Sequence, residues 1–468
     1  SYSDTNAKGE GISPAYLIGS IRSLYPKLEI ENSYCYPENP EAGIDLFLEK
    51  LVQETEKEHE DILEQADETD AMFGELYSWY LRNPEYRSRV QKLVQSAFAG
   101  KPEDIISQSV AKALYGEVSP YSATRLERFA ACAFAHFLQY GMKLTERVEY
   151  EFKPMDMGNV MHEALESFAE EVRKRGMKWT ELTEQERNEI ADRCLDNIVA
   201  DYGNTVLKSS ARNEYMIERT RRILRRTVWA LQKQLEQGEF QPEGFEVTFG
   251  GGRIDRVDIM EDQNKVYVKV IDYKTGNTSF DLVYLYHGLQ LQLMIYLDGA
   301  LRVEQKKYPD KEIIPAGVFY YNIKDPMIQE KIDADVEAVS AGLMKELKMN
   351  GLVQADPELV YRMDSSLGSI PVAFNKDGSF RKNSSVADRT QFAVLGRYVR
   401  TKIEKIRSSI LEGDAEVSPY ELGKKNACTY CPYMTVCGFD RRLSGYEFRR
   451  LKNFSDEELW KAFDREAE

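Results

Sequence analysis

Four cysteines constrain the fold of this chain more than any other feature of its sequence. Cys428, Cys431 and Cys437 form a C-x2-C-x5-C cluster, whereas Cys132 stands alone far upstream. Three thiolates can bind one metal centre, but a closed site needs a fourth ligand, and Cys132 is the obvious candidate. Such a centre would join the two ends of everything between them. Four thiolates suit both Zn²⁺ and a [4Fe–4S] cluster, and spacing alone does not choose.

The composition indicates a folded globular protein. The chain has 468 residues, of which 42% are hydrophobic and 30% are charged, and this length favours two or three domains. There is no apolar run of about 18 residues, so no membrane span is predicted. Six unevenly spaced cysteines do not form a secreted disulfide framework, and we expect a reducing cytoplasm. Cys35 and Cys194 are interpreted as ordinary residues.

The net charge of −16 argues against a protein that coats nucleic acid indiscriminately. Local basic tracks remain compatible with DNA binding, because binding depends on where the charges lie. One track, in a helical stretch, includes Arg222 and Arg226, and a second begins at Lys424 and Lys425. A solvated helix face explains each track by itself equally well.

Hydrophobic periodicity divides the chain near Ser119. Residues 12–116 have amphipathic helical spacing. Ser119-Pro120 then predicts a turn, followed by a helix that carries Cys132. A loop at Gly158 is expected to open a further helix.

The hydrophobic period changes from helical to strand-like further along the chain. Three segments rich in Val, Ile, Tyr and Phe are predicted strands: 245–259, 265–273 and 316–323. A helical pattern lies between the last two. This order predicts a mixed α/β core. Helices are predicted at 180–237, 286–301 and 387–412, and a hairpin at 371–381.

Two aspartates on neighbouring predicted strands are candidates for catalysis. Asp255 ends a Gly-Arg-Ile-Asp run, and Asp272 and Lys274 share one face of the next strand because strand side chains alternate. A hairpin would place Asp255 beside Asp272. Adjacent carboxylates repel unless a cation lies between them, and hard oxygen ligands favour Mg²⁺ or Mn²⁺. Asp258 is a rival carboxylate, but it faces the opposite way from Asp255, which we favour.

Three other residues are weaker candidates by themselves. Gln292 and Tyr296 are four apart on a predicted helix and share a face, although a locally satisfied, partly buried pair would give the same pattern. His162 lies near a helix start, where a lone histidine is more often structural than a ligand. No G-x4-G-K-[ST] sequence occurs, so we expect no ATPase site.

Taken together, these residues resemble a known family. The RecB-type branch of the PD-(D/E)XK nucleases is resembled by His162, the Gly252-Arg253-Ile254-Asp255 run, Asp272-Tyr273-Lys274 and Gln292-x3-Tyr296. With its cysteines added, the chain is similar to the iron–sulfur-stapled nuclease subunits of AddAB-type bacterial helicase–nucleases. The segments 126–134 and 376–380 also resemble that family.

The resemblance implies a role for each candidate. The implied metal ligands for Mg²⁺ or Mn²⁺ are His162, Asp255, Asp272 and the backbone carbonyl of Tyr273. Lys274 would position the attacking water, and Gln292 and Tyr296 would bind or orient the DNA backbone. A structural [4Fe–4S] cluster would be held by Cys132, Cys428, Cys431 and Cys437. The expected further DNA contacts are Arg222, Arg226, Lys424 and Lys425.

The resemblance also implies a restriction-endonuclease-like core with large helical insertions. The expected domains are a helical segment at 1–118, which would end a helicase-like region, and a nuclease at 119–468. The nuclease would contain a helical insertion at about 176–240 and an iron–sulfur staple at 428–437. The chain would then be the C-terminal part of a longer protein, without the part that recognises recombination hotspots.

The implied activity is metal-dependent exonucleolytic hydrolysis of single-stranded DNA ends. It would serve recombinational repair of double-strand breaks in the bacterial cytoplasm, in a heterodimer with an AddA-like helicase subunit. One alternative is a non-catalytic DNA-binding or scaffolding subunit. Another is a stand-alone exonuclease of the same superfamily.

Overall fold

A computed structural model describes most of the chain. The described residues are 16–27, 40, 43–44, 46–48, 50–51, 68–97, 105–116, 122–145, 154–201, 210–250, 252–328, 335–442 and 445–467. The chain divides into two compact units, residues 1–100 and 101–468. No helix within the described ranges is both long and apolar enough to cross a membrane.

The smaller unit is helical where it is described. Its named helices are α1 (Tyr16–Leu24), α3 (Glu68–Arg82) and α4 (Pro84–Ala97). Its buried apolar residues form one cluster, with Phe47 stacked on Phe73 and packed edge-on against Tyr80.

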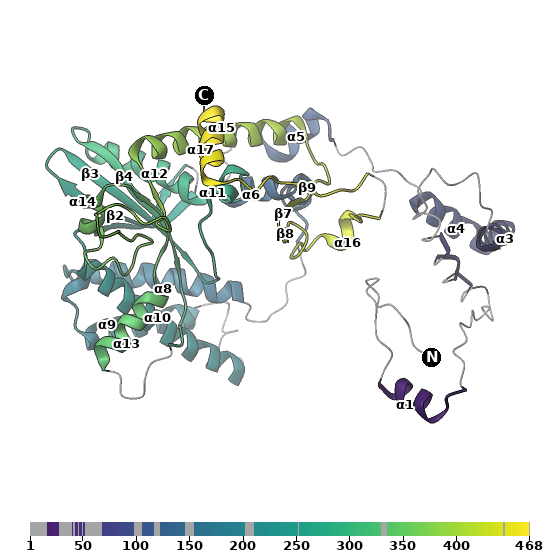
Figure 1. Cartoon of the computed structure of the whole chain (residues 1–468), viewed down its shortest axis with the longest axis horizontal. Helices are drawn as coiled ribbons and strands as arrows, with labels where there is room; N and C mark the ends of the chain where they lie inside the picture. The colour runs from purple at the N-terminus through teal and green to yellow at the C-terminus, as the bar shows by residue number, and fades with distance from the viewer. Residues whose placement is uncertain are drawn as a thin grey trace. The chain divides into compact units, whose positions relative to one another are not determined.

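A six-stranded sheet forms the centre of the larger unit (Figure 1). Its strands, in spatial and chain order, are β1 (Gln241–Phe249), β2 (Gly252–Asp262), β3 (Lys265–Lys274), β4 (Glu312–Asn322), β5 (Asn350–Gln354) and β6 (Val386–Ala387). The β3–β4 and β5–β6 pairs are parallel and the others antiparallel. The predicted mixed α/β core is therefore confirmed.

Helices cover both faces of this sheet (Figure 1). On one face lie α8 (Pro154–Lys174), α9 (Glu184–Asp201) and α10 (Ala211–Glu236). On the other lie α6 (Ala123–Ala131), α12 (Gln292–Lys307), α15 (Arg389–Glu412) and α17 (Asp456–Ala467). Strand β3 is buried on both faces, with Val268 in one core and Tyr267 in the other, which explains its nearly continuous apolar sequence.

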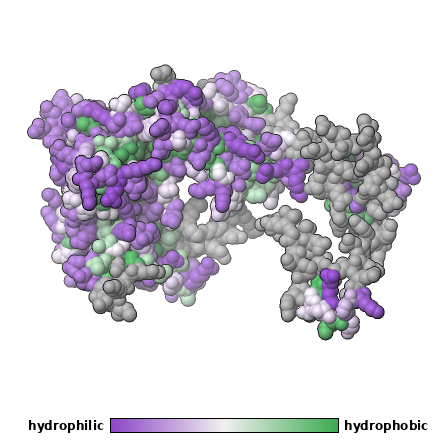
Figure 2. Space-filling model, viewed as in Figure 1, coloured by the Kyte–Doolittle hydropathy of each residue, from purple (hydrophilic) through white to green (hydrophobic). Residues whose placement is uncertain are grey.

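Shorter elements complete the larger unit. They are α5 (Gln108–Tyr115), α7 (Ala133–His136), the π-helical turn Phe137–Gly141, the 3-10 turn Trp179–Glu181, α11 (Leu282–Tyr286), α13 (Val336–Glu346) and α14 (Pro357–Met363). A second sheet has the order β8-β7-β9. It consists of β7 (Tyr420–Leu422), β8 (Lys425–Asn426) and β9 (Arg449–Arg450), with α16 (Met434–Cys437) between the last two in sequence. The surface that Figure 2 shows over the larger unit is mostly hydrophilic.

Two predicted elements were wrong because each is divided at a glycine. The predicted strand 245–259 is two strands, and β2 begins at Gly252, whose φ of +148° favours glycine. The predicted helix 286–301 is two helices, α11 and α12, separated by a turn in which Gly288 has a φ of +79°.

Two predicted helix boundaries were also wrong. Gly158 lies inside α8, which begins at Pro154. Cys132 does not lie within a helix but ends α6, since its backbone is extended with a φ of −166°. The turn predicted at Ser119-Pro120 lies outside the described residues.

Candidate active site

Neighbouring strands bring three carboxylates into one row across the sheet. Glu246 on β1 lies opposite Asp255 on β2 by the register of that pair. Because Arg256 pairs with Ile271, Asp255 lies next to Asp272 on β3. Paired residues project their side chains to the same face of a sheet. We refer to Glu246, Asp255 and Asp272 as the carboxylate row.

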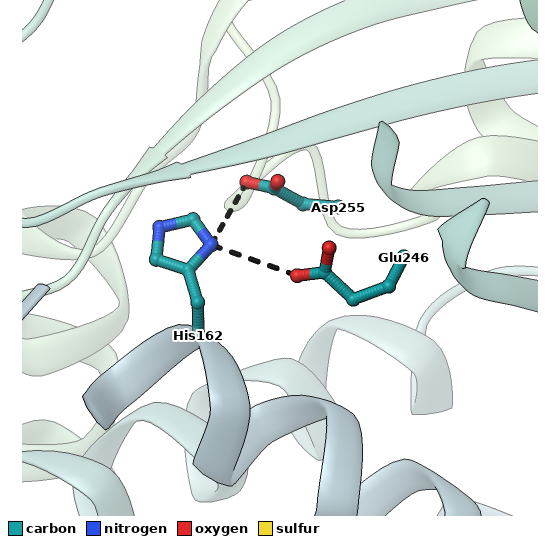
Figure 3. A group of neighbouring side chains, drawn as sticks. All are labelled: His162, Glu246 and Asp255. Atoms are coloured by element: carbon teal, nitrogen blue, oxygen red, sulfur yellow. Dashed lines mark ion pairs between the residues drawn. The ribbon is translucent and has the colours of Figure 1, made fainter. Parts of the chain in front are cut away.

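Helix α8 adds an imidazole to this row. The Nδ1 atom of His162 lies 3.3 Å from Oδ2 of Asp255 and 3.9 Å from Oε1 of Glu246 (Figure 3). The ligand atoms of these three residues all lie within 4.8 Å of one another, and theirs is the one such group of His, Cys, Asp or Glu found in the described part of the chain. Burial lowers the pKa of His162, but the hydrogen bond to Asp255 and the neighbouring negative charges outweigh it and raise the pKa.

Glu246 is the member of the site that the sequence analysis missed. Its φ of +49° is uncommon for a residue with a side chain, and such conformations concentrate at functional sites. Burial, reinforced by the charge of Asp255, raises the pKa of Glu246 to about 7, and Arg253 forms an ion pair with it. The position was recognisable only from strand pairing, which the sequence analysis did not resolve because it merged β1 with β2.

Asp272 is the most deeply buried member of the carboxylate row, with 1% of its surface exposed. Burial and the adjacent charge of Asp255 raise its pKa to about 7. Asp255 is partly stabilised by the backbone N–H of Tyr273, which donates a 2.7 Å hydrogen bond to Oδ2. Buried carboxylates this close together carry negative charge with little compensation, which is an arrangement that binds a divalent cation.

Lys274 connects the carboxylate row to helix α12. Its Nζ lies 2.6 Å from Oδ2 of Asp272 and donates a 2.8 Å hydrogen bond to Oε1 of Gln292. The Nε2 of Gln292 in turn donates a 2.9 Å hydrogen bond to the hydroxyl of Tyr296. The structure therefore brings together five predicted residues, Asp255, Asp272, Lys274, Gln292 and Tyr296, next to His162.

Asp258, the rival carboxylate, faces away from the carboxylate row. It is fully buried, and its oxygens lie 2.6 Å from Nε of Arg256 and 3.0 Å from Nζ of Lys269. These two cations lower its pKa despite the burial, which acts in the opposite direction. The local charge of Asp258 is thus already balanced by the protein itself.

The predicted basic residues lie apart from this group. Arg222 Nε is 2.6 Å and Arg226 Nε is 3.9 Å from the carboxylate of Asp325, which offsets part of the charge of that track. Lys425 Nζ lies 5.3 Å from the ring centre of Tyr284, and Lys424 is exposed.

The four cysteines meet in one place. Cys132 lies between α6 and α7, and together with Cys428, Cys431 and Cys437 it lines a single small pocket. None of them forms a disulfide bond. Burial raises the pKa of the Cys428 thiol to about 12, and the other three sulfurs add to the rise. No three of these sulfurs lie within 4.8 Å of one another.

Contacts around the pocket tie the C-terminal segment to the start of the larger unit. The backbone N–H of Phe134 donates a 3.0 Å hydrogen bond to the carbonyl of Glu416. The hydroxyl of Tyr433 donates a 3.0 Å hydrogen bond to the carbonyl of Leu144, and the guanidinium of Arg449 bonds the carbonyl of Ala130.

A sheet flanked by helices, with an Asp-x-Lys strand beside a second aspartate, is the arrangement of a PD-(D/E)XK nuclease. Residues 120–438 match the model of the PD-(D/E)XK nuclease superfamily, and the chain belongs to this superfamily. It is similar over its whole length to proteins named as one subunit of an ATP-dependent helicase/deoxyribonuclease. The identity is 39% for the Lachnoclostridium phytofermentans protein and 31% for those of Thermoanaerobacter sp. strain X514 and Clostridium acetobutylicum. The chain spans only 42–43% of the length of these relatives.

The raised carboxyl pKa values predict how the stability of the metal-free chain depends on pH. Asp272 and Glu246 have folded-state pKa values of about 7, above their ordinary values of 3.8 and 4.5. A raised carboxyl pKa stabilises the folded state below the unfolded pKa, and this stabilisation is lost as pH rises through the folded pKa. We therefore expect the melting temperature in EDTA to fall by several degrees between about pH 5 and about pH 8, and added Mg²⁺ to restore it.

Glu246→Gln provides the control for this experiment. Because it removes one titrating carboxyl, the fall in melting temperature with pH should become smaller in the variant. A melting temperature in EDTA that falls equally steeply in both proteins would contradict the assignment of this pH dependence to the carboxylate row.

Proposed function

We propose that this chain is a metal-dependent deoxyribonuclease that hydrolyses phosphodiesters of single-stranded DNA ends. The observation that carries the proposal is the buried Asp272, held between Asp255 and Lys274 in a nuclease fold. The names of the similar proteins support deoxyribonuclease activity and assembly with a helicase partner of the AddA type. We extend this to end processing for recombinational repair in the bacterial cytoplasm, a compartment whose reducing conditions suit a site of free thiols.

The donor set fits Mg²⁺ or Mn²⁺, since it combines carboxylate oxygens with one imidazole. We assign His162, Asp255, Asp272 and the Tyr273 carbonyl as ligands, and Glu246 as a further one. When bound, the ion would lower the pKa of a water molecule and offset charge on the scissile phosphate.

The chain's own residues would orient the reactants around this site. Lys274, fixed by Asp272 and Gln292, presents a positive charge where the attacking water and the developing negative charge would lie. Gln292 and Tyr296 would hold the DNA backbone by hydrogen bonds. Outside the site, the proposed DNA contacts are Arg222, Arg226, Lys424 and Lys425.

For the four cysteines we propose a [4Fe–4S] cluster. Four thiolates on one zinc ion would lie about 3.8 Å apart, given Zn–S bonds of about 2.3 Å. The wider separation of these sulfurs favours a centre in which each thiolate binds a different iron. We further propose that residues 1–118 end a helicase-like region and that 119–468 form the nuclease, with its helical insertion at about 176–240.

Lys274→Ala tests the proposed chemistry. We expect the variant to keep the stabilisation by Mg²⁺, because the carboxylate row remains, and to cleave labelled single-stranded DNA at least about 10²-fold more slowly. Cleavage should be measured with the chain alone and with its helicase partner, on single-stranded and duplex substrates.

The matched control is Lys311→Ala. Lys311 forms an ion pair with Glu261 at the far end of the β2–β3 hairpin, so its loss should not slow cleavage. Equal cleavage rates for Lys274→Ala and the wild type would rule out the assigned role. Absence of Mg²⁺-dependent cleavage in the wild type, with and without partner, would favour a non-catalytic DNA-binding protein.

A further inference from the structure

Glu127 is a buried acid that none of the proposed catalytic roles uses. It lies on α6, and its Oε1 accepts hydrogen bonds from the backbone N–H groups of Leu291, at 2.7 Å, and Gln292, at 2.9 Å. Burial raises its pKa to about 7, although both amides favour the charged form. The cost of burying this carboxyl calls for a compensating role.

The two amides that Glu127 binds are the first of helix α12. Leu291, at the N-cap position of α12, provides no side-chain cap. Helix N-termini are usually capped by a side chain close in sequence, but this cap comes from 164 positions upstream. Glu127 therefore fixes the start of α12 from another part of the fold.

The residue at the start of α12 is Gln292, which holds Lys274. A continuous path of hydrogen bonds runs from Glu127 to the backbone of Gln292, from its side chain to Lys274, and by the ion pair to Asp272. A shift of the α12 N-terminus would move the Lys274 ammonium away from the position set by this path.

The opposite end of α6 is the cysteine pocket. Cys132 ends α6 five positions after Glu127, which is about 7.5 Å along a helix axis. The guanidinium of Arg449 bonds the carbonyl of Ala130 in the last turn, so the C-terminal segment holds this end in place. A single short helix thus joins the thiol site to the cap of α12.

We propose that Glu127 is a positioning residue that couples the cysteine site to Lys274. With α6 anchored at Cys132, Glu127 caps α12 and thereby holds Gln292 and Lys274 in register with Asp272. Loss of the thiol-bound centre releases α6, the cap withdraws, and Lys274 loses its support. The catalytic consequence rests on the proposed function, whereas the coupling of the thiol site to α12 does not.

Hydrogen exchange tests the coupling without any need for activity. In Glu127→Ala, the amides of Leu291 and Gln292 should exchange about fivefold to tenfold faster than in the wild type. Wild-type protein stripped of its thiol-bound iron should show the same change at these amides. In Glu127→Gln, whose carbonyl still accepts both hydrogen bonds, exchange should stay close to that of the wild type.

Asp356→Ala is the matched control. Asp356 likewise accepts hydrogen bonds from two amides, those of Glu358 and Leu359, at the start of α14. Its loss should speed exchange in α14 and leave α12 unchanged. In cleavage assays, Glu127→Ala should lower kcat about tenfold with little change in KM for DNA, and Glu127→Gln should restore most of the kcat; Asp356→Ala should alter neither.

Each result decides between distinct claims. Unchanged exchange at the start of α12, in Glu127→Ala or in the iron-stripped protein, would overturn the coupling. Faster exchange with an unaltered kcat in an active enzyme would overturn the positioning role. Faster exchange in a wild type that never cleaves DNA would leave the coupling standing and reject the proposed function instead.

Discussion

Asp272→Ala is expected to abolish Mg²⁺-dependent DNA cleavage, by at least about 10³-fold, while the fold stays intact. The buried carboxyl of Asp272 lies beside Asp255, and their repulsion in the absence of a cation destabilises the folded state. Removing it should therefore leave the melting temperature in EDTA equal to or above that of the wild type. Cleavage of labelled single strands and thermal melts with and without Mg²⁺ measure both parts.

Glu261→Ala is the control for this prediction. Glu261 lies on β2 at the other end of the hairpin and pairs with Lys311 at the surface, so the variant should cleave at the wild-type rate. Digestion by Asp272→Ala at the wild-type rate would refute the assignment of the carboxylate row as the catalytic site. A large loss of melting temperature would instead show that Asp272 is needed for folding.

Cys132→Ser is expected to remove the visible absorbance of the purified chain and to abolish cleavage with it. A bound cluster contributes several kcal/mol to folding, and without it the melting temperature should fall by on the order of 10 °C. Absorbance spectra with iron and sulfide analysis test the cluster, and cleavage assays on the same samples test its link to the active site.

Cys194→Ser separates this effect from the loss of any buried thiol. Cys194 is buried in α9, within the core on the other face of the sheet, and its replacement should leave the absorbance and the iron content unchanged. A colourless wild-type protein with one equivalent of zinc would contradict the cluster, and full cleavage by Cys132→Ser would contradict the coupling of the two sites.

Local rules were sufficient to group part of the site. The two-residue alternation of a strand placed Asp272 and Lys274 on one face, and helical spacing placed Gln292 four residues from Tyr296. The short turn between β2 and β3 made their antiparallel pairing, and hence the neighbour of Asp255, predictable. These rules concern contacts between residues that are close in sequence, which explains their success.

Contacts over long sequence separations were not accessible in this way. His162 was connected to Asp255 only through resemblance, since nothing local to α8 indicates which strand it approaches. Glu246 and Glu127 were missed, because the first needed the division between β1 and β2, and the second acts on amides 164 positions away. Backbone conformation also mattered, since Gly252 and Gly288 divide elements that appear continuous by hydrophobicity.

The contact of Arg449 with Ala130 joins residues 319 positions apart, and this separation has a consequence for synthesis. As the ribosome releases the chain from its N-terminus, α6 and the complete carboxylate row emerge long before β9. Closing so long a loop is slow, and unpaired apolar surface stays exposed until it closes. Chains that end before Cys428 would carry every proposed catalytic residue yet remain open. We expect such incomplete products to be inactive, so that only a fully translated protein gains the ability to cut DNA.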